Sequence, residues 1–221
     1  MPLLGILQYL LIAICILGCA VTIVSEGRDY SKGKWVFKPL ASTAFILLAY
    51  SVGALDSTYG TWILLGLALS WLGDALLIPK DSHRSFIFGI ISFLLGHVAY
   101  TLGFWSLGFN LSALFASIVG AVITSWLIYR WLSASLEGPF KAVVPIYIGV
   151  IMVMVVTAIS AAVHVAAASL IVGAVLFAVS DIFVARERFV AQGIVNRLVG
   201  LPMYYIAQLV LAFSVVIEVY S

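Results

Sequence analysis

The chain has 221 residues, of which 64% are hydrophobic and 9% are charged, and its net charge is +2. A soluble domain of this length carries roughly 25% charged residues, so the composition excludes a water-soluble globule. The balanced charge excludes a nucleic-acid-binding protein, which would show a basic face. We therefore expect an all-α, polytopic membrane protein surrounded by membrane lipids, with no nucleic acid among its partners.

Eight stretches are apolar enough to cross a bilayer as helices, for which about 20 residues are needed. In chain order they are residues 3–24, 39–55, 60–78, 86–107, 111–130, 142–160, 165–184 and 199–219. Pro39 is expected to open the second span much as Pro145 opens the sixth. The first stretch has no cationic segment before it and no small-residue cleavage site, so we interpret it as a retained span. The short connections predict one eight-helix transmembrane domain over residues 1–221.

All eleven lysines and arginines fall in the connections on one side of these eight spans. They are Arg28, Lys32, Lys34, Lys38, Lys80, Arg84, Arg130, Lys141, Arg186, Arg188 and Arg197. The positive-inside rule assigns this side to the cytoplasm and places both termini outside. Short loops and the absence of a eukaryotic sorting signal favour a bacterial plasma membrane. Nothing in the sequence indicates an oligomeric state.

The two halves of the chain resemble each other at an offset of about 107 residues. The segment LGLALSWLGDALLIP around Asp74 resembles VGAVLFAVSDIFVAR around Asp181. Further along, GHVAYTLGF at 96–104 aligns with MYYIAQLVLAF at 203–213. Four spans per half would make a 4+4 parallel repeat about an axis along the membrane normal. Apolar sequences also resemble each other by composition alone, so both interpretations stay open.

Asp74 and Asp181 are expected inside spans, whereas the other seven acidic residues fall in loops or near span ends. An ionisable group inside a span costs about 2.5–3.5 kcal/mol and therefore indicates a functional site. The rise of 1.5 Å per helical residue places both aspartates about 5–6 Å below the cytoplasmic boundary, at equal depth. The structural alternative is a pair of helix-ending acids that bind neighbouring backbone or an arginine.

Other polar side chains are expected in the same layer and are the candidate substrate-binding residues. They are Lys38, His97, Tyr100, Ser180, Tyr204, Tyr205 and Gln208. His97 and Tyr100 share one helix face. His97 should lie about 18 Å from the cytoplasmic end of its span. It is thus deeper than the aspartates and lines the pocket without touching the reacting atoms, unless it is simply a core histidine. Lys38 is either a positive-inside anchor or a headgroup contact.

Several chemistries have no support in the sequence, which contains no GxSxG, HExxH, CxxC or P-loop motif. The three histidines show no metal-ligand spacing, so neither a metal nor a cofactor is expected. Two aspartates with His97 would be the one conceivable metal-binding set. What remains is acid–base catalysis by two carboxylates or proton-coupled transport.

An ordered set of short motifs resembles the lysoplasmalogenase family, which is also called YhhN-like. The motifs are KPL at 38–40, WLGDALL at 71–77, GHVAY at 96–100, VSD at 179–181 and YYIAQ at 204–208. The resemblance covers nearly the whole chain and implies the same eight-span plan. It also implies a hydrolase that cleaves the sn-1 vinyl ether of lysoplasmalogens, which are single-chain phospholipids. The products would be a fatty aldehyde and glycerophosphocholine or glycerophosphoethanolamine.

The paired aspartates suit that reaction. Hydrolysis of a vinyl ether begins with proton transfer to the β-carbon and passes through an oxocarbenium ion. It therefore needs one protonated carboxyl and one carboxylate, as in glycosidases. Two close carboxyls in a poorly solvated site favour that state, because like charges do not both ionise cheaply. We therefore expect Asp74 and Asp181 to be catalytic, without an indication of which is the acid.

Three cations are candidates to meet the phosphate of such a lipid at the cytoplasmic mouth, namely Lys38, Arg186 and Arg197. Two other function classes stay open. A small proton-coupled transporter would also carry paired acids within the membrane and an internal repeat. A non-catalytic membrane scaffold would use both aspartates only for packing.

Overall fold

The computed structural model describes residues 5–28, 30–79 and 82–219, and all regular structure within these ranges is helical. The eight long helices are α1 (Ile6–Gly27), α2 (Ser31–Ser51), α3 (Thr58–Leu76), α4 (His83–Ser106), α5 (Leu111–Ser133), α6 (Phe140–His164), α7 (Ala168–Ala185) and α8 (Ile194–Ser214). A π-helical turn, η1 (Arg186–Val190), extends α7, and a short helix, α9 (Val216–Val219), follows α8. The expected all-α class is confirmed.

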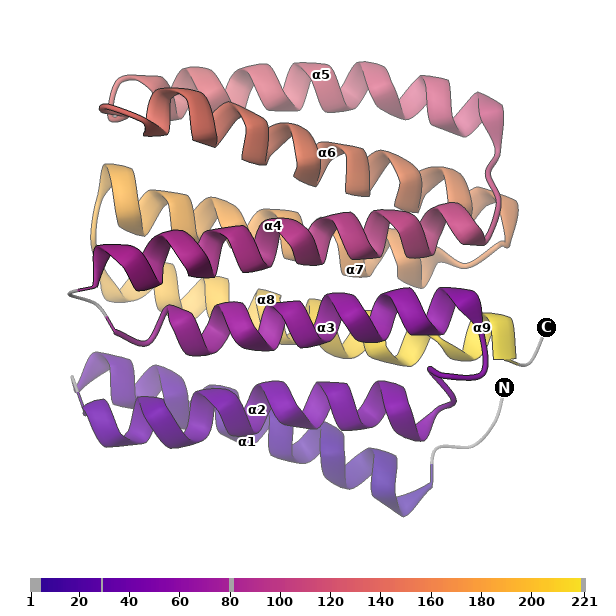
Figure 1. Cartoon of the computed structure of the whole chain (residues 1–221), viewed down its shortest axis with the longest axis horizontal. Coiled ribbons are helices and arrows are strands. Elements are labelled where there is room, and N and C mark those ends of the chain that lie inside the picture. The colour runs from indigo at the N-terminus through magenta and orange to yellow at the C-terminus, as the bar shows by residue number, and fades with distance from the viewer. Residues whose placement is uncertain (1–4, 29, 80–81, 220–221) are drawn as a thin grey trace.

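Seven of the eight long helices are long and apolar enough to cross a membrane, so the expected polytopic membrane protein is also confirmed. The helix outside this group is α2, whose first half carries Lys32, Lys34 and Lys38. These lysines lower its mean hydropathy, but α2 has 21 residues and lies alongside α1 and α3 (Figure 1). It therefore occupies the position of the second of eight spans.

Two predicted boundaries are wrong, and the prolines expected to open the second and sixth spans, Pro39 and Pro145, both lie inside their helices. The second span was expected to begin at residue 39, but α2 begins at Ser31 and Pro39 lies inside it. The last span was expected over 199–219, but α8 runs from Ile194 to Ser214. In both cases a polar segment that was assigned to a loop forms the first turns of the helix. Some of its side chains, including those of Lys38 and Asn196, are buried against neighbouring helices.

The helices pack as four sequential pairs, α1 with α2, α3 with α4, α5 with α6, and α7 with α8. Contacts of α2 with α3, α4 with α6, α6 with α7, and α8 with α1 join these pairs into a ring of seven helices. Helix α5 lies outside this ring at one edge of the bundle (Figure 1). It packs mainly against α6, and Leu132 is its one buried residue within the described chain.

Two glycines bring α3 close to α4. A Cβ atom on Gly66 would lie 2.4 Å from the ring of Tyr100, and one on Gly73 would lie 2.6 Å from the ring of Phe93. Small residues at such positions allow membrane helices to approach closely. The Phe93 ring in turn packs edge-on against Tyr204 of α8, with centroids 5.9 Å apart. The close α3–α4 packing therefore helps to position α8 beside α3.

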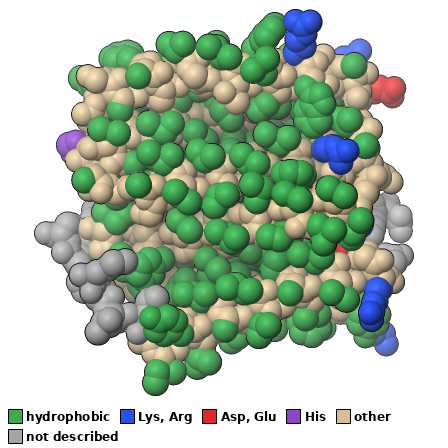
Figure 2. All heavy atoms as spheres, turned by 180° about the vertical axis from the view of Figure 1, so that it is seen from behind, with side chains coloured by type: hydrophobic (Ala, Val, Ile, Leu, Met, Phe, Trp, Pro, Cys, Tyr) green, Lys and Arg blue, Asp and Glu red, His purple; other side chains and the backbone are tan. Residues whose placement is uncertain are grey.

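The described lysines and arginines lie at the end of the bundle where α1 ends and α2 begins, which we call the cationic end. The start of α1 and the end of α8 lie at the opposite end (Figure 1). Figure 2 shows lysine and arginine side chains toward one end of a face that is otherwise largely hydrophobic. This asymmetry agrees with the topology expected from the sequence, in which the cationic end faces the cytoplasm.

Candidate functional site

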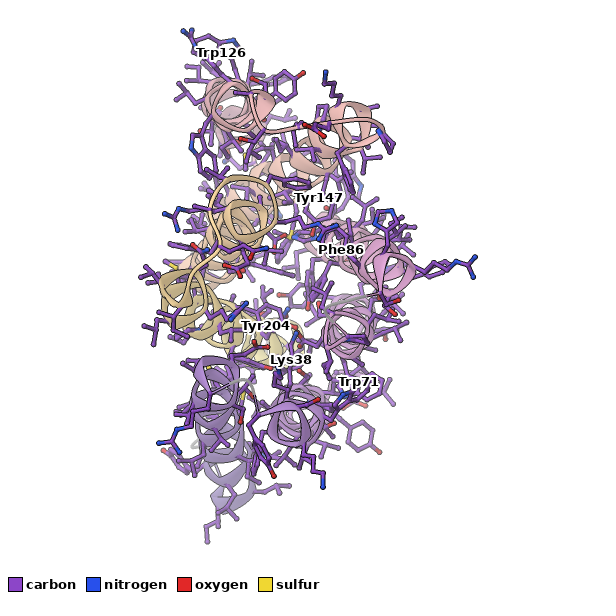
Figure 3. All side chains as sticks on the ribbon, turned by 90° about the vertical axis from the view of Figure 1, so that its left-hand side faces the viewer. Lys38, Trp71, Phe86, Trp126, Tyr147 and Tyr204 are labelled. Atoms are coloured by element: carbon purple, nitrogen blue, oxygen red, sulfur yellow. The ribbon has the colours of Figure 1, made fainter. Side chains whose placement is uncertain are left out.

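A cavity of about 450 Å³ lies between the helices at the cationic end. Its volume falls in the range of small-molecule sites, which is roughly 300–1,000 Å³. The polar residues Lys38, Asp74, Tyr147, Asp181 and Tyr204 line it, and apolar residues from α4, α6 and α7 form much of its wall. Figure 3 looks along the helices from this end and shows Lys38 and Tyr204 next to each other in the interior. Both predicted catalytic aspartates therefore face one cavity.

Asp74 of α3 is 2% exposed and is held by three side chains. The Lys38 ammonium nitrogen lies 3.3 Å from its Oδ1 atom. The Ser42 hydroxyl donates a hydrogen bond to Oδ2 at 2.5 Å, and the Tyr204 hydroxyl donates another at 2.7 Å. Because one partner is a cation and the other two donate, this environment stabilises an ionised carboxylate.

Asp181 of α7 has a different set of partners. The Tyr147 hydroxyl donates to its Oδ2 atom at 2.9 Å, and the Nε2 atom of His97 lies 3.4 Å from the same oxygen. No lysine or arginine within the described residues forms an ion pair with Asp181. Asp181 therefore lacks the permanent cation that Asp74 has.

The other ring nitrogen of His97 determines how the histidine faces Asp181. Nδ1 lies 2.7 Å from the backbone oxygen of Phe93. A carbonyl oxygen only accepts, so Nδ1 must carry a hydrogen. In a neutral ring the Nε2 atom is then an acceptor, and it faces a carboxyl oxygen at 3.4 Å. Nε2 has no hydrogen-bond partner within the described residues. A proton on Asp181 or on Nε2 would convert this contact into a hydrogen bond.

Each aspartate is contacted from the opposite half of the chain. His97 of α4 reaches Asp181 of α7, and Tyr204 of α8 reaches Asp74 of α3. At the offset of about 107 residues, His97 corresponds to Tyr204 as Asp74 corresponds to Asp181. Both contacts therefore join the first half of the chain to the second.

Four of the seven candidate substrate-binding residues do not line the cavity, namely His97, Tyr100, Tyr205 and Gln208. The Tyr100 hydroxyl donates to the side-chain oxygen of Gln208 at 2.6 Å, and the Tyr205 hydroxyl donates to the backbone oxygen of Lys38 at 3.4 Å. These buried residues lie outside the cavity lining and pack next to the residues that form it. Lys38, Ser180 and Tyr204 do line the cavity, although the Ser180 hydroxyl donates to the backbone oxygen of Phe177 at 2.7 Å.

His97 was expected to line the pocket without touching the reacting atoms, but it lies outside the cavity lining and contacts Asp181. The helical segment that carries Asp181 was expected to end at residue 184, but η1 continues it to Val190. Asp181 therefore lies farther from the end of its segment than the expected distance of about 5–6 Å. In the structure its carboxyl lies within 3.4 Å of the Nε2 atom of His97.

Charged and polar side chains form a network at the mouth of the cavity. Arg197 of α8 lies 2.7 Å from Glu187 of η1 and 3.5 Å from Glu26 of α1. The side chain of Asn196 also donates to Glu187, at 2.6 Å, and accepts a hydrogen bond from Arg186. The network connects α1, η1 and α8 and holds the π-helical turn in place.

Sequence reasoning missed two residues of the site, Ser42 and Tyr147. Ser42 had a signal, because it follows Lys38 by four residues and therefore lies on the same face of a helix. The boundary placed at residue 39 separated the two and hid this relation. Tyr147 is a single tyrosine in an apolar span and had no signal of its own.

No group of three or more His, Cys, Asp or Glu side chains is placed to hold a metal ion within the described ranges. His97 contacts Asp181, whereas Asp74 is occupied by Lys38, Ser42 and Tyr204. The set of two aspartates and His97 is therefore not assembled around one point.

Comparison with known proteins places the chain among membrane proteins. The family model described as YhhN family matches residues 33–215. A lysoplasmalogenase TMEM86A from Bos taurus is 33% identical over 80% of this chain and 75% of its own length. The Homo sapiens protein of the same name is 31% identical over the same shares. An uncharacterized membrane protein YhhN from Escherichia coli O157:H7 is 32% identical over 54% of this chain and 60% of its own length.

No solved structure matches the chain. The family model covers most of the helical bundle, from the first turn of α2 to the end of α8. All the side chains that contact Asp74 and Asp181 lie within the matched residues. The chain belongs to the YhhN family.

Proposed function

We propose that this protein hydrolyses the sn-1 vinyl ether bond of lysoplasmalogens within the membrane. The relatives named lysoplasmalogenase support the substrate class. The cavity supports the reaction type, because the buried Asp74 and the largely buried Asp181 face it from α3 and α7. Its largely apolar walls suit a single hydrocarbon chain. The products are a fatty aldehyde and the glycerol phosphodiester of the headgroup.

The two aspartates have different roles in this proposal. Asp181 is the general acid, and Asp74 is the ionised carboxylate that stabilises positive charge. The observation that carries the assignment is the position of Lys38, 3.3 Å from Asp74. The Asp181 carboxyl instead faces a tyrosine hydroxyl and a histidine acceptor. Because charge on a buried carboxyl is costly without a cation, the proton resides on the Asp181 side of the site.

The reaction then runs in three steps. Asp181 transfers its proton to the β-carbon of the vinyl ether, whose π electrons form the new C–H bond and leave an oxocarbenium ion. Water adds to the α-carbon and returns a proton to Asp181, which gives a hemiacetal. The hemiacetal breaks its bond to the glycerol oxygen, and the hydroxyl proton moves to that oxygen as the aldehyde forms. One water is consumed, and Asp74 lowers the energy of the cationic stage.

The experiment that tests the activity is aldehyde release from lysoplasmalogen by purified protein in detergent. In deuterated water the aldehyde should carry one deuterium on the carbon next to its carbonyl. One of the two hydrogens on that carbon is transferred from the exchangeable carboxyl of Asp181, and the other was already present in the substrate. An ester-linked lysolipid is the negative control. Folded wild-type protein that releases no aldehyde from choline or ethanolamine substrates would remove the proposed function. Proton-driven solute flux in liposomes would then be measured next.

Variants separate the two roles. Asp181→Asn should lower kcat by about 10²–10⁴-fold, the usual contribution of general acid catalysis, while Asp181→Glu keeps a proton donor and part of the rate. Infrared spectroscopy at neutral pH should detect the carbonyl stretch of a protonated carboxyl in wild type and in Asp74→Asn, and lose it in Asp181→Asn. Loss of that band in Asp74→Asn, with retention in Asp181→Asn, would reverse the assignment.

A further inference from the structure

We propose that Arg188 binds the phosphate of the lipid headgroup at the mouth of the cavity. The choice of lipid rests on the function proposed above. Three cations line the cavity, Lys38, Arg188 and Arg197. Lys38 is paired with Asp74, and Arg197 is paired with both Glu187 and Glu26. Arg188 has no carboxylate partner within the described chain, so its charge is available to an anionic ligand.

The contact that holds Arg188 leaves its hydrogen-bond donors free. Its guanidinium carbon lies 4.3 Å from the centre of the Phe86 ring. Stacking on an aromatic face uses the flat side of the guanidinium, while its N–H groups project from the edge. Phe86 packs against Phe140, which packs against Phe189, with centroids 6.4 Å and 5.2 Å apart. All three rings line the cavity, so the exposed Arg188 rests on an aromatic wall at the mouth. A planar fork held in this way suits two parallel hydrogen bonds to a phosphate.

The position of Arg188 also fits the length of the substrate. Asp181 and Arg188 lie on one continuous helical segment, formed by α7 and η1. The helix rise places their Cα atoms about 10 Å apart. The sn-1 ether and the sn-3 phosphate of a lysolipid are separated by the three carbons of glycerol, and side chains from these two positions span that distance. The ether would then lie deep at Asp181 and the phosphate at the mouth.

This inference revises the expected set of phosphate contacts. Lys38 and Arg197 are occupied by acidic partners. Arg186 binds Asn196 and does not line the cavity. None of the three is as available as Arg188. The network around Arg197 has the different role of fixing η1, the turn that carries Arg188.

The test compares a substrate that has a phosphate with one that lacks it. Arg188→Gln should raise KM for a lysoplasmalogen by about 10- to 100-fold, the range expected for a lost charged hydrogen bond. It should leave KM for the phosphate-free 1-alkenylglycerol unchanged. Arg130→Gln is the matched control, because Arg130 also stacks on an aromatic ring, that of Trp126 at 5.2 Å, but lies outside the cavity lining. Equal changes for both substrates, or the same change in Arg130→Gln, would overturn the proposal.

A binding measurement keeps the inference testable if hydrolysis is not observed. A 1-alkyl lysophosphocholine, whose saturated ether resists hydrolysis, should raise the Tm of the wild type clearly more than that of Arg188→Gln. A 1-alkylglycerol without phosphate should shift the Tm of both proteins equally. Inorganic phosphate at the same concentration should shift neither, and equal protection by it would overturn the headgroup assignment. Absence of aldehyde release with this binding pattern intact would reject the hydrolase but retain the role of Arg188.

Discussion

Lys38 is a lysine buried inside a membrane bundle, and its ammonium is neutralised by one carboxylate. The side chain of Lys38 is 11% exposed and that of Asp74 is 3% exposed. Removing one member of such a pair leaves an uncompensated charge, which is costlier than replacing both members. Ser42 and Tyr204 add hydrogen bonds that satisfy the second carboxylate oxygen. The pair therefore contributes to stability only as a complete unit.

Lys38→Met should lower the free energy of unfolding by about 3–5 kcal/mol, because Asp74 is left buried without its cation. The double variant Lys38→Met/Asp74→Asn should recover most of that loss, since both charges are gone. Thermal unfolding in detergent measures the stability of the single and the double variant. A double variant as unstable as Lys38→Met would show that Lys38 acts through packing of its alkyl chain instead.

At the scale of the helices, hydropathy predicted most of the spans. The exceptions are the starts of α2 and α8, where polar residues were assigned to loops. A hydropathy scale counts every lysine as solvent-exposed, but Lys34 and Lys38 are buried. The sequence alone does not reveal that Lys38 pairs with Asp74, 36 positions later. This pairing allows α2 to begin before residue 39 with Lys38 buried. The extension of α7 by η1 was missed for a similar reason, since Arg186 and Glu187 of η1 bind Asn196 and Arg197 of α8.

The candidate site was predicted in part. Asp74 and Asp181 stand out in the sequence because charged groups inside spans are rare. Their partners do not stand out, because serine and tyrosine are common in apolar helices. Which side chains face the cavity depends on helix rotation and on contacts between distant segments. The buried Tyr100 and Gln208, for example, bind each other and not the cavity.

The close packing of α3 on α4 provides a prediction about Gly73. A Cβ there would lie 2.6 Å from the Phe93 ring, and that ring packs on Tyr204. Gly73→Ala should therefore lower stability by about 1–3 kcal/mol, the usual cost of overpacking, and should lower kcat by displacing Tyr204 from Asp74. The measurements are Tm and aldehyde release.

The matched control for Gly73 is Gly149 of α6, which has open space where a Cβ would lie. Gly149→Ala should keep full activity and be neutral or stabilise the helix by up to about 1 kcal/mol. Similar losses of stability and activity in both variants would mean that the close contact between α3 and α4 does not cause the effect of Gly73→Ala.

For the whole molecule, the cationic end predicts the orientation in the membrane. Glu137 lies between α5 and α6 at that end, and Asp56 lies between α2 and α3 at the opposite end; both are exposed. In a background with Cys15 and Cys19 replaced by serine, Glu137→Cys should react with an impermeant thiol reagent only from the cytoplasmic side. Asp56→Cys should react only from the other side. Labelling of oriented vesicles measures this, and the reverse pattern would place the mouth of the cavity outside.

The exchange of partners between the two halves has a consequence for biosynthesis. Tyr204, which completes the surroundings of Asp74, lies on α8, the last of the long helices to leave the ribosome. His97 of α4, in contrast, enters the membrane three helices before its partner Asp181 of α7. Asp74 is therefore the acid whose surroundings are completed last. A nascent chain that stops before α8 would lack Tyr204 and the α8 side of the cavity wall, so the proposed activity would require the helix that closes the ring.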